Sequence, residues 1–208
     1  QQKKMPETVM PRLTLTFDNG PTLGATEKVL DELSRRSILS TFFLVGEQLQ
    51  AEGARDLAVR AKQAGHWIGN HTMTHGQPLG LRLDETHPAE ESGAAERLIG
   101  ALAQTPKLFR PNGKASYGRH LLSETAVEYL VAQRYTVVTW TSVPGDYEEP
   151  WDAWVPRALD DIAHNDWTVM VLHDAGGNGI DYLPRFFDAL PASVEIVQDF
   201  PESCLPIK

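Results

Sequence analysis

The stretch that decides the fold is Leu13-Thr14-Leu15-Thr16-Phe17-Asp18-Asn19-Gly20-Pro21, in which five alternating apolar and polar residues precede a carboxylate, an amide and a turn signal. Alternation with a period of two predicts a β-strand over residues 13–17. Gly20-Pro21 predicts that the chain turns directly afterwards. Asp18 and Asn19 therefore sit at the end of a strand, where α/β folds collect their functional groups.

Similar apolar segments recur along the chain and alternate with amphipathic stretches of helix length. Strands are predicted at residues 13–17, 41–45, 67–68, 108–109, 136–140, 168–172 and 194–197. Helices are predicted at residues 26–36, 51–64, 90–103, 123–134, 152–164 and 183–190, with a surface loop at 76–88. This alternation implies a parallel sheet, either doubly wound or barrel-shaped. We favour a barrel, because the polar motifs follow several different strands and must converge on one face.

Composition limits the classes of protein to which the chain can belong. Its 208 residues suit a single domain spanning residues 1–208, and its apolar and charged fractions of 41% and 23% are those of a globular protein. A net charge of −9 argues against binding to nucleic acid or to an anionic membrane, and no apolar run is long enough to span one. One cysteine, Cys204, excludes an internal disulfide without fixing the compartment. Because the chain begins at Gln1, an exported protein whose signal peptide has been removed is compatible with the sequence.

Two histidines four residues apart, His71 and His75, lie in a polar segment with glycines before it. Neutral imidazole is a common zinc ligand, and this spacing can present two rings to one cation, although such pairs also arise by chance. His66 is expected to be structural and His87, in the irregular loop, to be solvated.

Other strand ends also carry polar side chains. Arg110 follows the predicted fourth strand, and its planar fork suits a carboxylate. His173 breaks the apolar run at 169–172, and an acidic neighbour can raise its pKa so that it starts protonated. Each feature has an ordinary alternative: Asp18 could cap a helix, Asn19 could be a turn residue with positive φ, and His173 could simply face solvent.

In this order, the segments resemble the polysaccharide deacetylase family with the NodB homology domain, carbohydrate esterase family four. Its first motif, Thr-Phe-Asp-Asp-Gly-Pro, is matched by residues 16–21, with Asn19 in place of the second Asp. Its His-Ser/Thr-x-x-His motif is matched by residues 71–75. The later motifs are matched in part by Arg110-Pro111, by Asp146-Tyr147 and by Val171-Leu172-His173. The resemblance covers most of the chain and implies a distorted parallel (β/α) barrel with fewer than eight strands.

The resemblance also implies a reaction and assigns roles. The family removes N-acetyl groups from amino-sugar polymers such as chitin or peptidoglycan, using a divalent metal, most often zinc. It implies that Asp18 is the general base, that His173 is the general acid, that Arg110 orients the base and that Asp146 tunes the acid. The implied metal ligands are Asn19, His71 and His75, and the implied substrate contacts are Pro111, Tyr147 and Val171.

The departures from the family motifs leave alternatives open. A neutral amide at Asn19 is a weaker ligand than a carboxylate, so metal occupancy is in question. Val143 stands where the family has a further Asp, and the third motif diverges at Asn112 and Gly113. The chain could instead hydrolyse another amide or imide bond, or bind carbohydrate without catalysis.

Overall fold

The computed structural model describes residues 10–114 and 116–208, in which seven parallel strands form one sheet. The strands are β1 (Arg12–Asp18), β2 (Thr41–Leu44), β3 (Trp67–Asn70), β4 (Lys107–Phe109), β5 (Tyr135–Val137), β6 (Trp167–His173) and β7 (Glu195–Ile196). All strand pairs run in parallel, which confirms the predicted α/β class with fewer than eight strands. No helix in this part of the chain is long and apolar enough to cross a membrane.

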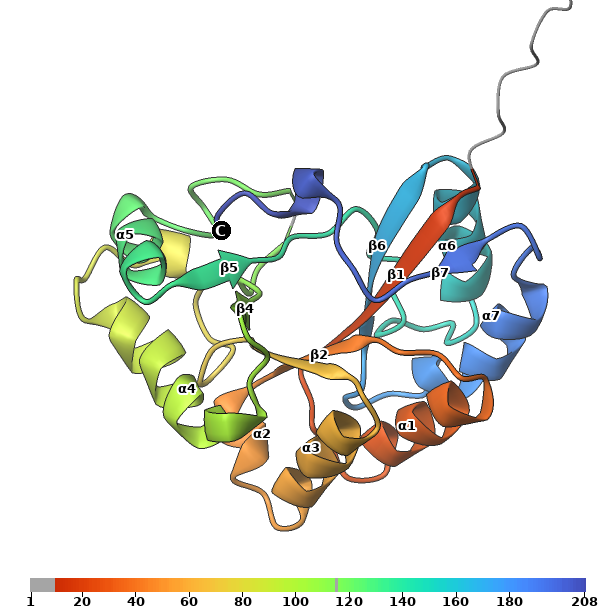
Figure 1. Cartoon of the computed structure of the whole chain (residues 1–208), viewed down its shortest axis with the longest axis horizontal. Coiled ribbons are helices and arrows are strands. Elements are labelled where there is room, and N and C mark those ends of the chain that lie inside the picture. Colours follow the sequence, from red (N-terminus) through yellow and green to blue (C-terminus); the bar gives the residue numbers. More distant parts are fainter. Residues whose placement is uncertain (1–9, 115) are drawn as a thin grey trace, which may run out of the picture.

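Strand β1 lies between β2 and β6 in the sheet, whose order is β5-β4-β3-β2-β1-β6. Strand β6 pairs along all of β1, whereas β2 pairs with its carboxyl half and β7 with its amino end. Within the described residues the sheet does not close into a complete barrel. An isolated bridge between Ser142 and Met170 links the segment after β5 to β6, and Ile207 near the carboxyl end bridges Val137 (Figure 1).

Helices surround the sheet on its outer side, as Figure 1 shows. They are α1 (Ala25–Arg35), α2 (Gly46–Leu49), α3 (Ala54–Gln63), α4 (Ala94–Ile99), α5 (Glu124–Ala132), α6 (Trp154–Ala163) and α7 (Leu183–Ala189). Helix α1 begins after Gly24 and packs with Val29, Leu30 and Leu33 buried. Asp18 therefore does not cap this helix.

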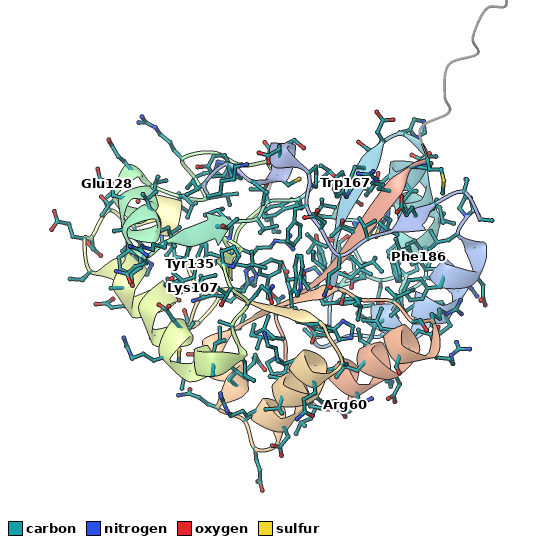
Figure 2. The ribbon with its side chains drawn as sticks, in the orientation of Figure 1. Arg60, Lys107, Glu128, Tyr135, Trp167 and Phe186 are labelled. Atoms are coloured by element: carbon teal, nitrogen blue, oxygen red, sulfur yellow. The ribbon has the colours of Figure 1, made fainter. Side chains whose placement is uncertain are left out.

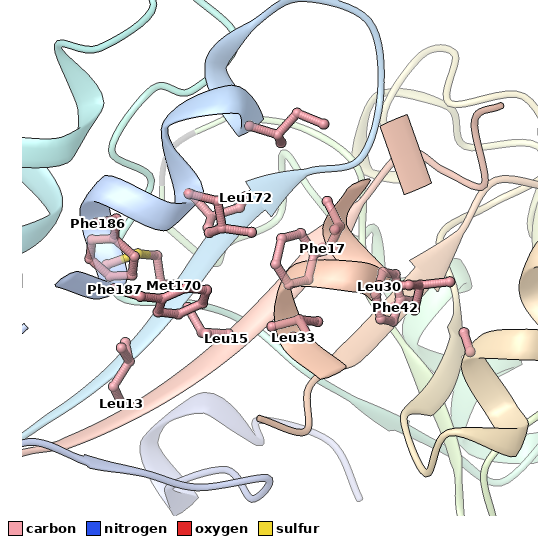
Figure 3. Packing of buried hydrophobic residues seen from close by; sticks show 14 of the residues in the cluster. Leu13, Leu15, Phe17, Leu30, Leu33, Phe42, Met170, Leu172, Phe186 and Phe187 are labelled. Atoms are coloured by element: carbon pink, nitrogen blue, oxygen red, sulfur yellow. The ribbon is translucent and has the colours of Figure 1, made fainter. Parts of the chain in front are cut away.

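The two faces of β1 differ in polarity, because successive side chains of a strand point to opposite faces. Leu13, Leu15 and Phe17 point toward the helices and join the largest apolar cluster, together with Met170 and Leu172 of β6 (Figure 3). Thr14, Thr16 and Asp18 occupy the opposite face and are buried as well, whereas Arg12 at the start of the strand is exposed. The alternation thus separates an apolar packing face from a polar face inside the sheet.

The interior of the sheet is filled by side chains (Figure 2). Phe43, Val138, Val169 and Phe200 belong to one buried cluster there. At the end of the sheet opposite β6, the ammonium group of Lys107 on β4 lies 4.3 Å from the centre of the Tyr135 ring on β5.

Several predicted boundaries were wrong, each for a local reason. The predicted helix at 90–103 is broken into a π-helical turn (Ala89–Gly93), α4 and a 3-10 turn, because Gly100 adopts φ 55° and ends α4. The predicted strand at 136–140 ends at Val137, since the chain leaves β4 and Ser142 bonds to β6 instead. The predicted surface loop packs back on the protein: Leu79 joins a core cluster and His87 is buried, not solvated.

Candidate functional site

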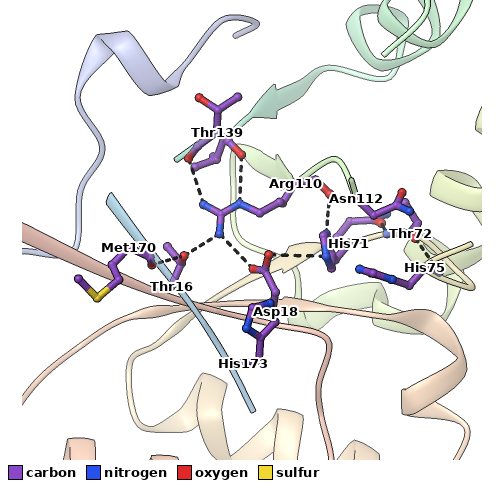
Figure 4. Close-up of polar contacts among 12 residues, drawn as sticks. Thr16, Asp18, His71, Thr72, His75, Arg110, Asn112, Thr139, Met170 and His173 are labelled. Carbon is purple, nitrogen blue, oxygen red and sulfur yellow. Dashed lines mark hydrogen bonds and ion pairs between the residues drawn. The ribbon is translucent and has the colours of Figure 1, made fainter. Parts of the chain in front are cut away.

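Polar side chains from four strand ends meet at the carboxyl edge of the sheet (Figure 4). Asp18 ends β1, His71 directly follows β3, Arg110 directly follows β4, and His173 ends β6. Asp18 and His173 are direct partners in the β1–β6 register. Parallel strands place their carboxyl ends on one edge, which explains how residues more than 150 positions apart come together.

Arg110 is fully buried and holds the polar face of β1 in place. Its Nη1 donates to Asp18 Oδ1 at 3.0 Å and to Thr16 Oγ1 at 2.6 Å, and its Nε and Nη2 donate to the carbonyls of Val138 and Thr139. The guanidinium carbon also lies 4.3 Å from the Phe43 ring centre. A planar fork with this many fixed acceptors has one orientation, so Arg110 sets the position of the Asp18 carboxylate.

The Asp18 carboxylate is held in its ionised form. Burial by itself raises its pKa, but the positive charge and hydrogen bond of Arg110, with His71 and His173 in their protonated forms, outweigh burial and keep the pKa below its usual 3.8. Asp18 Oδ2 lies 3.6 Å from His71 Nε2. The site therefore contains a buried anion at neutral pH that faces an imidazole nitrogen.

His71 is arranged as a neutral ligand. Its Nδ1 lies 2.7 Å from the carbonyl oxygen of Arg110, which can only accept, so Nδ1 carries the proton and Nε2 presents its lone pair. Burial lowers the pKa of His71 to about 4, despite the opposing charge of Asp18. The exposed ring of His75 lies 5.0 Å from the His71 ring, centre to centre. Both histidines belong to a tight loop and not to a helix, and the structure brings them together as the sequence predicts.

Asn19 follows β1 in the left-handed region, with φ 79°, as a turn residue can. Its Oδ1 is buried and accepts no hydrogen bond within the described residues. Two imidazoles, of which one is locked in its neutral form, and an unpartnered amide oxygen are types of donor that suit a divalent cation. The described residues hold no cluster of three His, Cys, Asp or Glu side chains placed to hold a metal.

His173 forms a second acid–base unit with Asp146. Its Nδ1 donates to Asp146 Oδ1 at 2.7 Å, and its backbone N–H donates to Asp146 Oδ2 at the same distance. Burial lowers the pKa of His173, but the hydrogen bond and charge of Asp146 outweigh burial and raise it above 6.5. The ring of Tyr147 meets that of His173 edge-on at 5.2 Å. The pair therefore favours the protonated form of His173.

Asp174 directly follows His173 at the end of β6. It is fully buried and accepts a hydrogen bond from Thr26 Oγ1 at 2.8 Å, whereas its Oδ1 has no partner among the described residues. Burial raises the pKa of Asp174 to about 6. A Cβ at Gly20 would lie 2.2 Å from Asp174 Oδ2, so only glycine fits against this carboxyl group.

The remaining predicted substrate contacts differ in accessibility. Tyr147 is partly exposed, but Pro111 and Val171 are buried. His66 is structural as expected: it is buried and its Nδ1 accepts from the Ser40 amide. Sequence reasoning missed Thr16, although its even-numbered place in the β1 alternation was the available signal. Nothing in the sequence indicated the carbonyl groups that hold Arg110.

Comparison with known proteins identifies the family. A family model described as polysaccharide deacetylase matches residues 6–133, more than half of the chain. The chain belongs to this family, which confirms the prediction of a deacetylase-type enzyme. A solved structure of a polysaccharide deacetylase from Bacillus cereus is 27% identical, with a TM-score of 0.75 over 95% of this chain and 96% of that one.

Two characterised relatives add detail. A peptidoglycan-N-acetylglucosamine deacetylase of Bacillus cereus is 35% identical over 130 residues, which cover 62% of this chain but only 44% of that longer protein. A chitooligosaccharide deacetylase of Rhizobium leguminosarum bv. phaseoli is 30% identical over 80% of this chain and 69% of its own length.

Proposed function

We propose that this protein hydrolyses N-acetyl groups of amino-sugar polymers or oligomers in a metal-dependent reaction, with Asp18 as general base and His173 as general acid. The observation that carries the proposal is the pairing at one strand edge of an ionised carboxylate with a proton-bearing histidine. The activities named for the two relatives support amino sugars as the substrate class.

The histidine and amide donors of the site indicate which residues would hold the metal. His71, His75 and Asn19 would be its protein ligands, and zinc is our preferred candidate because imidazole suits it. When bound, a divalent cation would supply a Lewis acid that polarises the acetyl carbonyl. The neutral Asn19 would add no negative charge to this ligand set.

The chain's own residues then account for the proton movements. Asp18 accepts a proton from the attacking water as the oxygen adds to the acetyl carbon. Arg110 keeps the carboxylate ionised and aimed while this happens. His173 donates the proton on its Nε2 to the amine nitrogen as the C–N bond breaks, and Asp146 retains its hydrogen bond to Nδ1. Acetate and a free amino group are the products.

The test is acetate release from N-acetylglucosamine oligomers and from peptidoglycan, with metal content measured in the same preparation. We expect chelation to abolish acetate release and zinc or cobalt to restore it. Asp18→Asn should lower turnover about 10²–10⁴-fold while the metal content remains, because Asp18 is assigned as a base. Full turnover of metal-free protein would contradict the metal, and near-normal turnover of Asp18→Asn would contradict the base.

One observation favours a second function, carbohydrate binding without catalysis. Asn19 stands where the family motif has a carboxylate, so the site could lack the charge that retains a metal. Binding of N-acetylglucosamine oligomers by calorimetry, in a protein that takes up no metal and releases no acetate, would establish this alternative.

A further inference from the structure

The loop at residues 71–75 carries both histidines in a backbone conformation that it does not favour on its own. Thr72 and His75 have φ 73° and 53°, in the left-handed region that non-glycine residues rarely adopt. Such conformations cost free energy and persist only where surrounding contacts impose them. The partners of the loop's backbone groups therefore determine whether the two rings face each other.

The partners come from outside the loop as well as from within it. The carbonyl groups of Thr72 and Met73 accept from the first amides of α2, Gly46 and Glu47. The Thr72 amide donates to the side chain of Asn70, and the His75 amide donates to Thr72 Oγ1. Two amides in the middle of the loop, those at 73 and 74, remain to be satisfied.

Glu91 satisfies both of these amides with one carboxylate. Its Oε2 accepts from the Met73 amide at 3.1 Å and from the Thr74 amide at 3.0 Å, and its Oε1 accepts from Thr74 Oγ1 at 2.7 Å. Hydrogen bonds from backbone amides to an ionised carboxylate are stronger than those between neutral groups. Glu91 therefore contacts the loop at the turn between His71 and His75.

The backbone around Glu91 is itself unusual. Residues Ala89–Gly93 form a π-helical turn directly before α4. Such turns are rare, and they occur frequently at functional sites. In the same turn, the Ser92 carbonyl accepts from Asn70 Nδ2 at 2.8 Å, so a second bond joins the turn to the end of β3.

We propose that Glu91 is a positioning residue that holds the histidine loop in its metal-binding conformation before a metal arrives. The part of the proposal that concerns metal rests on the function proposed above, whereas the part that concerns the loop does not. Removal of a residue that hydrogen-bonds to metal ligands, without binding the metal itself, typically lowers metal affinity 10–100-fold. Within the described residues Glu91 makes no hydrogen bond to either ring, so it acts through the loop backbone.

The experiment compares Glu91→Ala with Glu90→Ala. The control removes the same charge from the same turn, and Glu90 makes no side-chain hydrogen bond to the loop within the described residues. We expect amide exchange at Met73 and Thr74, measured in metal-free protein, to rise at least about tenfold in Glu91→Ala. Cobalt affinity by calorimetry should fall about 10–100-fold in the same variant, and Glu90→Ala should change neither.

Unchanged exchange at Met73 and Thr74 in folded Glu91→Ala would overturn the proposal. If that variant fails to fold, Thr74→Val removes only the Oγ1 bond at an exposed position and should still increase exchange at Thr74. If the unaltered protein binds no cobalt, the metal assignment fails, and amide exchange still decides the role of Glu91. If it binds cobalt and Glu91→Ala binds it equally well, the positioning role fails while the proposed function stands.

Discussion

Replacing Arg110 by methionine tests the centre of the site most directly. The substitution keeps an unbranched apolar stem but removes the guanidinium group, and with it the charge and the donors to Asp18, Thr16, Val138 and Thr139. Asp18 would remain as a buried carboxylate without its main partner, since it is only 4% exposed. Removing one member of a buried ion pair typically costs about 3–5 kcal/mol, a large fraction of the stability of a domain.

The loss should depend on pH, and its sign follows from Asp18. In the unaltered protein the pKa of Asp18 is lowered, so its contribution to stability is present above pH 3.8 and is lost as the pH falls through the folded-state pKa. Without Arg110, burial becomes the dominant influence and raises the pKa of Asp18 above 3.8. The carboxylate then destabilises the variant increasingly as the pH rises. The stability difference between the two proteins should therefore widen from pH 4.5 to pH 7.5.

The assay is urea unfolding at pH 4.5, 6.0 and 7.5, together with the pH profile of kcat/KM. We expect the acid limb of the profile to move to higher pH in Arg110→Met, because a larger share of Asp18 is protonated. Arg110→Lys, which keeps the charge but loses the fork, should lie between the two proteins in stability. An equal loss of stability at all three pH values, with an unmoved acid limb, would refute the pairing of Arg110 with Asp18.

Four further substitutions address the other parts of the site. Asn19→Asp adds an anionic oxygen where an unpartnered amide oxygen is buried, and we expect zinc affinity by calorimetry to rise at least about tenfold; unchanged affinity would remove residue 19 from the ligand set. Asp146→Asn should lower the pKa of His173, because burial is then less opposed, and shift the basic limb of activity to lower pH; NMR titration of the ring checks this directly. His173→Ala should impair amide hydrolysis far more than hydrolysis of an activated aryl acetate, and equal losses would exclude the acid role. For Asp174, a pKa raised from 3.8 to about 6 corresponds to about 3 kcal/mol of folding stability, which is present at low pH and lost as the pH rises through 6. The stability of Asp174→Asn relative to the unaltered protein should therefore increase by about that amount from pH 3.5 to pH 8. A difference that stays constant with pH would show that Asp174 does not titrate this way.

The sequence was sufficient for features that depend on local periodicity and short motifs. Alternation from Leu13 to Phe17 predicted β1 and its two faces, because the direction of a strand side chain depends only on its place in the strand. The positions of Asp18, His71, Arg110 and His173 just at or after strand ends were predicted for the same reason. The rule that parallel strands align their carboxyl ends then brought these residues to one edge.

Tertiary structure alone decided how these residues act on one another. Arg110 takes its acceptors from β1 and from the segment after β5, at separations of 28 to 94 positions, and no local pattern encodes such pairings. The end of β5 depends on where the chain leaves β4 for β6, and the break before α4 brings Glu91 to the histidine loop. The register of the strands and the course of the segments between them determine these contacts, because the free energy that selects them comes from packing across the whole sheet. The sequence thus determined which side chains lie at the edge, and the folded sheet determined their partners, their charges and their pKa values.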